Sequence, residues 1–383
     1  MSDNEKNIDD KKSTDTSAQV IKAQSNTTHS KSSINEIYLS NSPHFVSPVN
    51  TQRLMLNVVI SLTPIAVFSI YLYGLQALLR LFVSTACTVI FESIFRAMIH
   101  KDIRAKDFSA VITGLLLALV MPPTIPIWIL ILSAFFAIVV GKEFFGGLGK
   151  NPFNPALIGR AFAFVSFAGP MTTWATTRAS HFLGGLSGKV DALSKATTDV
   201  ISQATPLSQI NPVDGIVLSA ADIANKLHLG SAKDLYITLF WGNHGGSMGE
   251  TPVFLILLGF IFLLATKTIE WRISVSMLVS AALSSVLLGL IFLGAPIDPL
   301  LTLMSGGLMF GAVFMATDYT TSPVTPLGRI IFGAGCGFLS VVIRTFGSNP
   351  EGVMFSILIM NAVVPYLNQL LPKKYGFVKG GKK

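Results

Sequence analysis

The chain has 383 residues, of which 51% are hydrophobic and only 13% are charged, and its formal net charge is +8. Soluble globular domains carry about 25% charged residues, so the composition excludes that class and favours an integral membrane protein. No basic stretch interleaved with aromatic residues stands outside the apolar segments, so we expect membrane lipid and no nucleic acid as a partner.

The first fifty residues differ in composition from the rest of the chain. Residues 1–50 hold six acidic and five basic side chains and almost no apolar clusters, which is typical of disordered segments. They lack the apolar core of a secretory signal peptide. We therefore expect a disordered N-terminal tail in the cytoplasm, and we expect the first hydrophobic segment to serve as an uncleaved membrane-targeting signal.

Long apolar runs follow one another through the remainder of the chain. A spanning helix needs about 20 mostly apolar residues, and this criterion predicts an all-α polytopic membrane protein with about ten transmembrane helices. The segments lie near 54–73, 77–98, 108–122, 125–141, 156–174, 251–267, 272–294, 299–317, 328–346 and 352–371. They give a first transmembrane half over 51–174, a long loop over 175–250, a second transmembrane half over 251–372 and a basic tail over 373–383.

Proline residues interrupt the apolar run between the third and fourth segments. The sequence Met121-Pro122-Pro123-Thr124-Ile125-Pro126 removes backbone donors and disfavours a continuous helix. A hairpin between two short spans and a single kinked helix both fit this pattern. The hairpin is favoured because the combined length exceeds one bilayer crossing.

Lysine and arginine residues fall at alternate connections between the segments. Short cytoplasmic loops are rich in these residues, and the connections 73–77, 122–126 and 294–299 contain none. The other connections hold Arg96, Lys101, Arg104, Lys106, Lys142, Lys150, Arg160, Lys267 and Arg272, and five lysines lie near the end of the chain. Arg344 is the exception. The pattern predicts a multi-pass membrane protein with both termini in the cytoplasm and residues 175–250 outside.

Two stretches rich in glycine, proline and polar residues break the helical pattern. Residues 146–155 and 317–328 each lead to a Gly-Arg pair, and each is preceded by a Pro-x-x-Pro turn. Paired interruptions of this kind are typical of binding sites in duplicated membrane folds. The match aligns segments of the same orientation, whereas ten helices divided into two fives give an inverted repeat. The sequence leaves these two alternatives open.

Few ionisable residues lie in or near the apolar segments, and each is a candidate functional group. They are Glu92, Glu143, Asp298, Asp318 and Arg344. We expect Glu92 to pair with Arg96, one turn later on the same helix face, and Asp298 to be solvated in a turn. Asp318 stands in the second broken stretch, and we favour a role in a binding site for it.

Metal and hydrolytic chemistry have no support in the sequence. Cys87 and Cys336 are far apart and cannot supply the four thiolates of an iron–sulfur cluster. The six histidines show no metal-ligand spacing, and no nucleophile–base pair stands out. If this chain moves electrons, the carrier must therefore be an organic cofactor or belong to a partner protein.

The long loop contains a short motif that ends in threonine. It reads Asp199-Val200-Ile201-Ser202-Gln203-Ala204-Thr205. A threonine hydroxyl can take up a phosphoryl group as a phosphoester, and the spacing D-x-x-S-x-A-T resembles the acceptor site at which flavin transferases attach FMN. Val200 and Gln203 stand where that pattern usually has small residues, so the transferase must accept bulkier ones. We predict that Thr205 carries FMN, with Asp199, Ser202 and Ala204 completing the site.

Three further stretches match one family. They are residues 146–155, 245–250 and 315–328. Together with the acceptor motif, everything after about residue 42 resembles RnfD, a component of the Rnf electron-transport complex, and its relative NqrB of the sodium-pumping NADH:quinone reductase. Residues 319–326 look more like the Rnf protein than like its quinone-reducing relative.

The resemblance implies a ten-helix flavoprotein component of an ion-translocating complex that passes electrons from reduced ferredoxin towards NAD. It implies FMN attached to Thr205 by an FMN transferase, and partners among the other proteins of the Rnf-type complex. It leaves room for a second, noncovalent flavin such as riboflavin. Asn151, Asn154 and Asp318 lie in the matching stretches, and we count them among the cofactor-binding residues.

The matching stretch over 245–250 has two interpretations. Gly245, Gly246, Ser247 and Glu250 suit the polar edge of a flavin slot, because glycine permits close approach and the amino terminus of the next helix attracts a phosphate. Alternatively, the stretch is only an entry loop, with Glu250 favoured by the helix dipole.

A different functional class remains open beside the flavoprotein. A secondary transporter or channel is also expected to contain broken helices. Such a protein has no use for the motif that ends at Thr205.

Overall fold

The computed structural model describes residues 50–100, 107–174, 219–226, 231–242, 244–250, 252–347 and 351–370. Every regular element formed by these residues is a helix, which confirms the predicted all-α class. The expected disordered tail over 1–50 lies, apart from its last residue, outside the described residues.

The helices of the first half are α2 (Thr51–Tyr73), α3 (Leu75–Met98), α4 (Ser109–Leu119), α5 (Ile127–Phe135), the π-helix η2 (Phe136–Glu143), α6 (Pro155–Ser166) and α7 (Ala168–Met171). Two short helices follow, α11 (Ala220–Lys226) and α12 (Ala232–Trp241). The remaining helices are α13 (Val253–Ala265), α14 (Trp271–Leu288), η3 (Gly289–Leu293), α15 (Pro299–Met304), α16 (Leu308–Phe310), η4 (Gly311–Met315), α17 (Pro326–Phe346) and α18 (Val353–Leu367).

Among the described residues, four helices are long and apolar enough to cross a bilayer: Thr51–Tyr73, Leu75–Met98, Trp271–Leu293 and Pro326–Phe346. Shorter apolar helices accompany them at Ser109–Leu119, Pro155–Ser166, Val253–Ala265 and Val353–Leu367. Large apolar side chains such as Leu75 and Phe82 are about seven-tenths exposed. The chain is therefore a polytopic membrane protein.

The proline-rich interruption after α4 forms a turn between two helices. Helix α4 ends at Leu119 and α5 begins at Ile127, so the hairpin is correct and the single kinked helix is wrong. The segment predicted over 299–317 is divided into α15, α16 and η4. Helices α11 and α12 lie in the stretch that the sequence assigned to the long loop over 175–250, and α12 was not expected from the sequence.

Three helices begin at a polar residue followed by proline. Asn154 caps α6, Asp298 caps α15 and Thr325 caps α17, each accepting a hydrogen bond from a backbone N–H of the first turn. Proline at the first helical position lacks a donor that would have no partner there, and its φ already suits a helix. These caps fix where the chain re-enters the helix bundle after a break.

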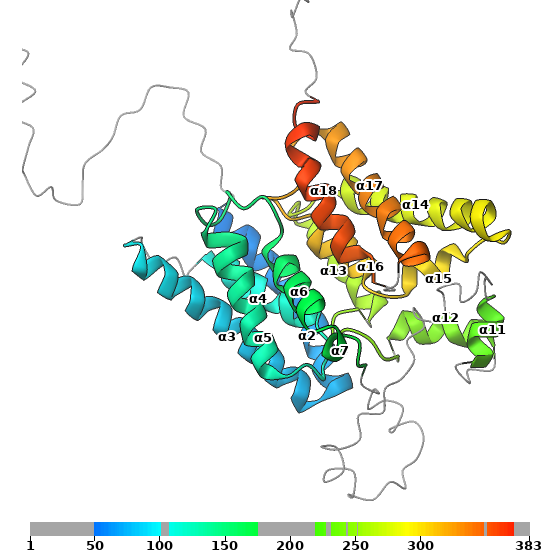
Figure 1. Ribbon diagram of the computed structural model, residues 1–383, viewed down its shortest axis with the longest axis horizontal. Helices are drawn as coiled ribbons and strands as arrows, with labels where there is room; N and C mark the ends of the chain where they lie inside the picture. Colours follow the sequence, from blue (N-terminus) through cyan, green and yellow to red (C-terminus); the bar gives the residue numbers. More distant parts are fainter. Residues whose placement is uncertain are drawn as a thin grey trace, which may run out of the picture. The chain divides into compact units, whose positions relative to one another are not determined.

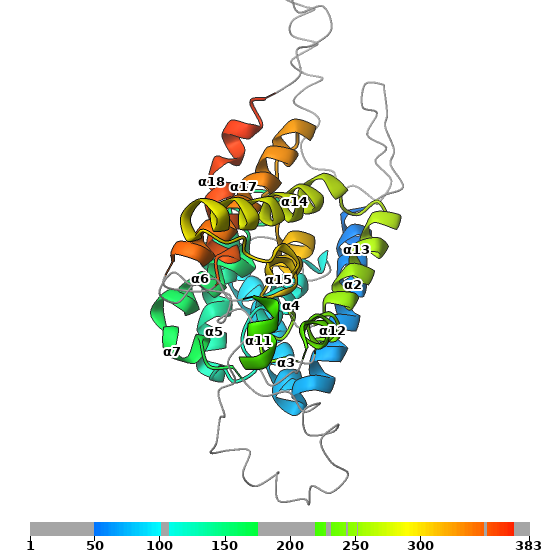
Figure 2. The ribbon, with the colours of Figure 1, turned by 90° about the vertical axis from the view of Figure 1, so that its right-hand side faces the viewer.

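Glycine and serine residues allow α14 and α17 to pack closely against each other. Figures 1 and 2 show α14 and α17 lying across each other. A Cβ at Gly333 or Gly337 of α17 would collide with backbone oxygens of α14, and Ser280 donates to the Ala334 carbonyl across 2.7 Å. Glycine and hydroxyl residues of this kind replace the hydrophobic effect as the source of helix association in lipid.

Further helix contacts connect the first half of the helices, α2 to α7, with the second half, α13 to α18. Figure 2 shows α2 and α13 running beside each other, and α6 packs against α18. The core between them is apolar and includes Leu62, Leu117, Ile129, Phe310 and Phe332, none more than 1% exposed.

Candidate functional site

A pocket lies where the two broken stretches meet. It holds about 710 Å³ of empty space, including its open mouth. Its lining residues are Met55, Val58, Ser109, Ile112, Thr113, Leu116, Lys142, Leu148, Asn151, Asn154, Pro155, Leu263, Ile269, Val313, Phe314, Thr317, Asp318, Tyr319 and Thr320. Three residues expected at a cofactor, Asn151, Asn154 and Asp318, therefore share one pocket.

Two asparagines join the first broken stretch to the second. The amide of Asn151 donates to Thr320 Oγ1 across 3.0 Å, and that of Asn154 donates to the Met315 carbonyl across 3.2 Å. Asn154 also accepts from the N–H of Ala156 as the cap of α6. Both side chains are at most 5% exposed. They build the wall of the pocket by holding two loops together that are far apart in sequence.

Asp318 is fixed within its own loop. Its Oδ2 accepts from the hydroxyls of Thr320 and Thr321 across 2.9 and 3.2 Å. Burial raises the pKa of the Asp318 carboxyl, and the hydrogen bonds from Thr320 and Thr321 and the charge of Lys142 act in the opposite direction. A carboxyl in this setting stays protonated at a higher pH than one in water.

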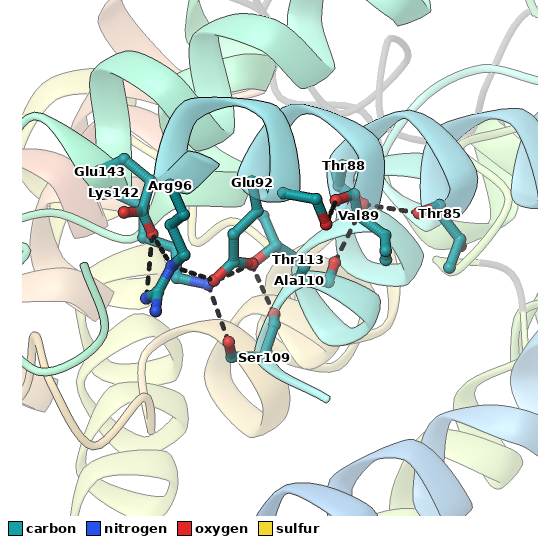
Figure 3. A network of polar contacts seen from close by, with 11 residues as sticks. Thr85, Thr88, Val89, Glu92, Arg96, Ser109, Ala110, Thr113, Lys142 and Glu143 are labelled. Atoms are coloured by element: carbon teal, nitrogen blue, oxygen red, sulfur yellow. Dashed lines mark hydrogen bonds and ion pairs between the residues drawn. The ribbon is translucent and has the colours of Figure 1, made fainter. Parts of the chain in front are cut away.

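Four charged residues from α3 and η2 form a buried network next to the pocket (Figure 3). Lys142 Nζ lies 2.9 Å from Glu92 Oε2 and 2.8 Å from Ser109 Oγ, and Arg96 bridges Glu92 and Glu143 at 3.4 and 3.3 Å. All four charged side chains are at most 7% exposed. The network balances two positive and two negative charges, as buried charges require.

The expected Glu92–Arg96 pair is confirmed, but it is only part of this network. Lys142, expected in a basic loop, is 2% exposed and lies near the end of η2. The burial of Lys142 was not expected from the sequence, because a lysine beside a glycine-rich stretch is typical of an exposed loop. The π-helix, a form often found at functional sites, sets the positions of Lys142 and Glu143.

The stretch from His244 to Glu250 is buried at a different place. Met248 and Gly249 donate their N–H groups to the carbonyls of Met121 and Leu119, across 3.2 and 2.6 Å. Ser247 N–H donates to Glu250 Oε2 across 3.3 Å. Gly245, Gly246, Ser247 and Glu250 do not line the pocket. The structure therefore separates these four predicted residues from Asn151, Asn154 and Asp318.

Glu250 belongs to a second buried group of charges, which we call the charge quartet: Arg160, Glu250, Arg344 and Glu351. Arg160 of α6 forms an ion pair with Glu351, which precedes α18. Glu250 interacts electrostatically with both arginines. Burial raises the pKa of both carboxyls, and the charge of Arg160 lowers it in each.

Two arginines of the quartet correct the charge pattern read from the sequence. Arg160 was expected beside a cytoplasmic loop, and Arg344 was the exception in a short loop. Both lie within helices and are at most 6% exposed. Arg344 donates to the carbonyls of Thr302 and Ser305, across 2.8 and 3.2 Å, at the break after α15. Neither is a loop charge, and no motif in the sequence pointed to Glu351.

Asp298 is a helix cap. Its Oδ1 accepts from the N–H groups of Leu300 and Leu301 across 2.9 and 3.2 Å, and its other oxygen accepts from the hydroxyl of Tyr236 in α12. Burial and the contact with Asp298 raise the pKa of Tyr236 to about 12. Asp298 thus holds α12 against α15.

The predicted acceptor motif lies outside the described residues. This applies to Asp199, Ser202, Ala204 and Thr205, so FMN attachment stays a prediction.

Comparison with known proteins gives consistent matches along most of the chain. Residues 38–376 match the family described as NQR2, RnfD, RnfE. The D-subunit of a proton-translocating ferredoxin:NAD(+) oxidoreductase complex from Clostridium ljungdahlii is 37% identical over 88% of this chain and 96% of its own length. The D-subunit of an ion-translocating oxidoreductase complex from Stutzerimonas stutzeri is 38% identical over 87% and 94%. The D-subunit of a Na(+)-translocating ferredoxin:NAD(+) oxidoreductase complex from Acetobacterium woodii is 36% identical over 90% and 98%.

Proposed function

The chain belongs to the NQR2, RnfD, RnfE family, and from this membership we propose that it is the flavin-carrying D-subunit of a bacterial ion-translocating ferredoxin:NAD oxidoreductase complex. The pocket that unites Asn151, Asn154 and Asp318 is the observation that carries the proposal. The related complexes are named for different ions, a proton and Na⁺, so the ion that moves is left open.

We assign the pocket to the noncovalent flavin. Its apolar walls, including Leu116, Leu263 and Phe314, suit a flat aromatic ring, and its polar residues include Lys142 and Asp318. A bound flavin supplies one- and two-electron transfer. The protein's own contribution is to orient the ring and to place a positive and a negative side chain near its polar edge.

Lys142 is the residue best placed to respond to charge in the pocket. Its ammonium group is shared between Glu92 and Ser109 and also interacts electrostatically with Asp318. Extra negative charge in a setting of low dielectric favours a nearby cation. Glu92 and Ser109 hold Lys142 in reach of the pocket while Arg96 and Glu143 balance the remaining charge.

Covalent FMN on Thr205 is the second part of the proposal. It is supported by the acceptor motif and by the family, and the enzyme that attaches it would be an FMN transferase. The electrons would come from, and go to, other proteins of the complex.

Ten membrane crossings divided into two inverted halves account for the helix order. In the first half α3 packs on α4 and α5, and α5 packs on α6; in the second, α14 packs on α15 and α17, and α17 packs on α18. This correspondence pairs α2 with α13 and α6 with α18. It supports the inverted repeat over the parallel one, which aligned α6 with α17. With both termini in the cytoplasm, the pocket lies on the cytoplasmic side.

The test is flavin content after blocking the pocket. Val58 lies in the lining, on α2, and Val58→Trp should lower the flavin that acid precipitation releases from the purified protein by at least tenfold. Val67→Trp is the matched control, because Val67 is on the same helix and is 59% exposed. Unchanged released flavin in Val58→Trp would place the noncovalent flavin elsewhere, and colourless unmodified protein would favour the transporter.

A further inference from the structure

We propose that the charge quartet binds one exchangeable proton, shared between the carboxyl groups of Glu250 and Glu351 and water trapped beside them. The site is separate from the pocket, since no member of the quartet lines the pocket. The proposal rests on the geometry of the quartet and does not depend on a flavin at Thr205.

Four separate elements bring these charges together. Arg160 comes from α6, Glu250 from the loop before α13, Arg344 from α17 and Glu351 from the turn before α18. Arg160, Glu250 and Arg344 are 5–6% exposed, and the Glu351 side chain is 13% exposed. Two carboxyl groups in one buried site repel each other when both are ionised, which favours a proton on one of them.

Several buried polar atoms around the quartet have no partner among the described residues. Within the quartet they are Arg160 Nε, Arg344 Nε and Glu351 Oε1. Ser247 Oγ and Ser305 Oγ are also without one, and these serines belong to the segments that contact Glu250 and Arg344. Buried polar groups rarely stay unsatisfied, and clusters of them usually hold ordered water. Trapped water provides the route by which a proton reaches a buried carboxylate.

The carboxyl groups are the members that can change protonation. Arginine stays charged in proteins, so Arg160 and Arg344 act as fixed positive charges. Uptake forms one O–H bond on a glutamate oxygen and breaks one O–H bond of a hydronium ion, and release reverses this without moving electrons. The raised pKa of both carboxyls agrees with this assignment.

A metal cation fits the site less well. Hard cations take about six oxygen ligands, and the carbonyl oxygens of Thr302 and Ser305, which lie beside Arg344, already accept hydrogen bonds from it. The two guanidinium groups also repel any further fixed cation. A proton needs only one carboxylate oxygen, such as Glu351 Oε1.

Infrared difference spectroscopy of the full-length protein between about pH 5 and about pH 9 tests the proposal, because a protonated glutamate has a carbonyl band that the ionised form lacks. The unmodified protein should show a titrating carboxyl band that shifts on ¹³C labelling of glutamate. Glu250→Gln or Glu351→Gln should remove most of this band. Glu270→Gln is the matched control, since its side chain is 47% exposed, and it should leave the band intact.

Conservative variants distinguish loss of the carboxyl group from loss of the folded structure. Glu250→Asp and Glu351→Asp keep a carboxyl group and should shift the band without removing it. A band that persists undiminished in both glutamine variants would overturn the assignment, as would the absence of any titrating glutamate band. A band suppressed by Na⁺ at constant pH would replace the proton by a metal cation.

Discussion

The ammonium group of Lys142 lies 2.9 Å from the carboxylate of Glu92, and both side chains are at most 5% exposed. The other contacts of the pair are longer or uncharged, because Glu92 lies 3.4 Å from Arg96 and Lys142 donates its second hydrogen bond to the hydroxyl of Ser109. A buried ion pair of this kind is costly to break from one side.

Removing Lys142 alone should therefore destabilise the protein more than removing both partners. We expect Lys142→Met to cost about 3–5 kcal/mol, and the double variant with Glu92→Gln to recover a substantial part of that loss. Unfolding midpoints followed by tryptophan fluorescence in one detergent would measure this. Equal loss in the single and double variants would show that the pair is not coupled.

Gly249 should tolerate no side chain. A Cβ there would lie 2.9 Å from Leu119 Cβ and 3.1 Å from Phe310 Cε2, so Gly249→Ala must displace the stretch that leads to Glu250. We expect a loss of about 1–3 kcal/mol, measured as a lower unfolding midpoint. Gly169→Ala is the control, because nothing lies within 4 Å of its added Cβ. Equal midpoints for both variants would contradict the close contact.

Thr205→Val should abolish covalent FMN while the protein still folds, because valine has the shape of threonine without the hydroxyl. Fluorescence of the band after denaturing electrophoresis, and mass spectrometry of the peptide, would report attachment. Ser202→Ala should have a milder effect on attachment. Finding the flavin phosphate on another residue would refute the assignment.

Sidedness can be measured with single cysteines in a background lacking Cys87 and Cys336. Cysteines at Ser187 and Ser231 should react with a membrane-impermeant reagent in intact cells, because the charge pattern puts residues 175–250 outside. A cysteine at Lys101 should react only after the membrane is opened. The reverse pattern would invert the topology and with it the position of the FMN.

Asp318→Asn should leave Thr205 flavinylated but lower the number of ions moved per electron, or slow turnover. Asparagine can still accept from Thr320 and Thr321, so the loop is retained and only the charge is lost. Moving one charge against 100 mV costs about 2.3 kcal/mol, so coupling needs a group whose charge follows the redox state. Reconstituted complex that pumps at the unmodified rate and ratio would exclude Asp318 from this role.

The sequence predicts an element of the fold well where a single pattern, such as a long apolar run or a proline, determines the local structure. Helices α2 and α3 were expected because long apolar runs are typical of membrane-spanning helices. The break after Leu119 was expected because proline ends a helix. Helix α12 was missed because a ten-residue helix inside a polar loop has neither a long apolar run nor a breaker on both sides.

The charged residues show where such reasoning fails. Because of their positions along the chain, Lys142, Arg160 and Arg344 were expected in or beside loops. Their partners are distant in sequence: Glu92 lies in another helix, Glu351 in a turn and Ser305 at a helix break. The sequence pattern cannot show these long-range partners, which are what allow the three cations to be buried. Asn151 and Asp318 were singled out individually, and only the packing of two distant stretches shows that they line one pocket.

The hydrogen bonds from Asn151 to Thr320 and from Asn154 to Met315 have a consequence for biogenesis. Each bond joins a residue emerging early from the ribosome to one made more than 150 residues later. The wall of the pocket is therefore absent while the first helices are being inserted, and it closes only after η4 has entered the bundle. Loading of a small molecule into this pocket is consequently a late event in the life of the chain, and a truncated translation product cannot sequester it.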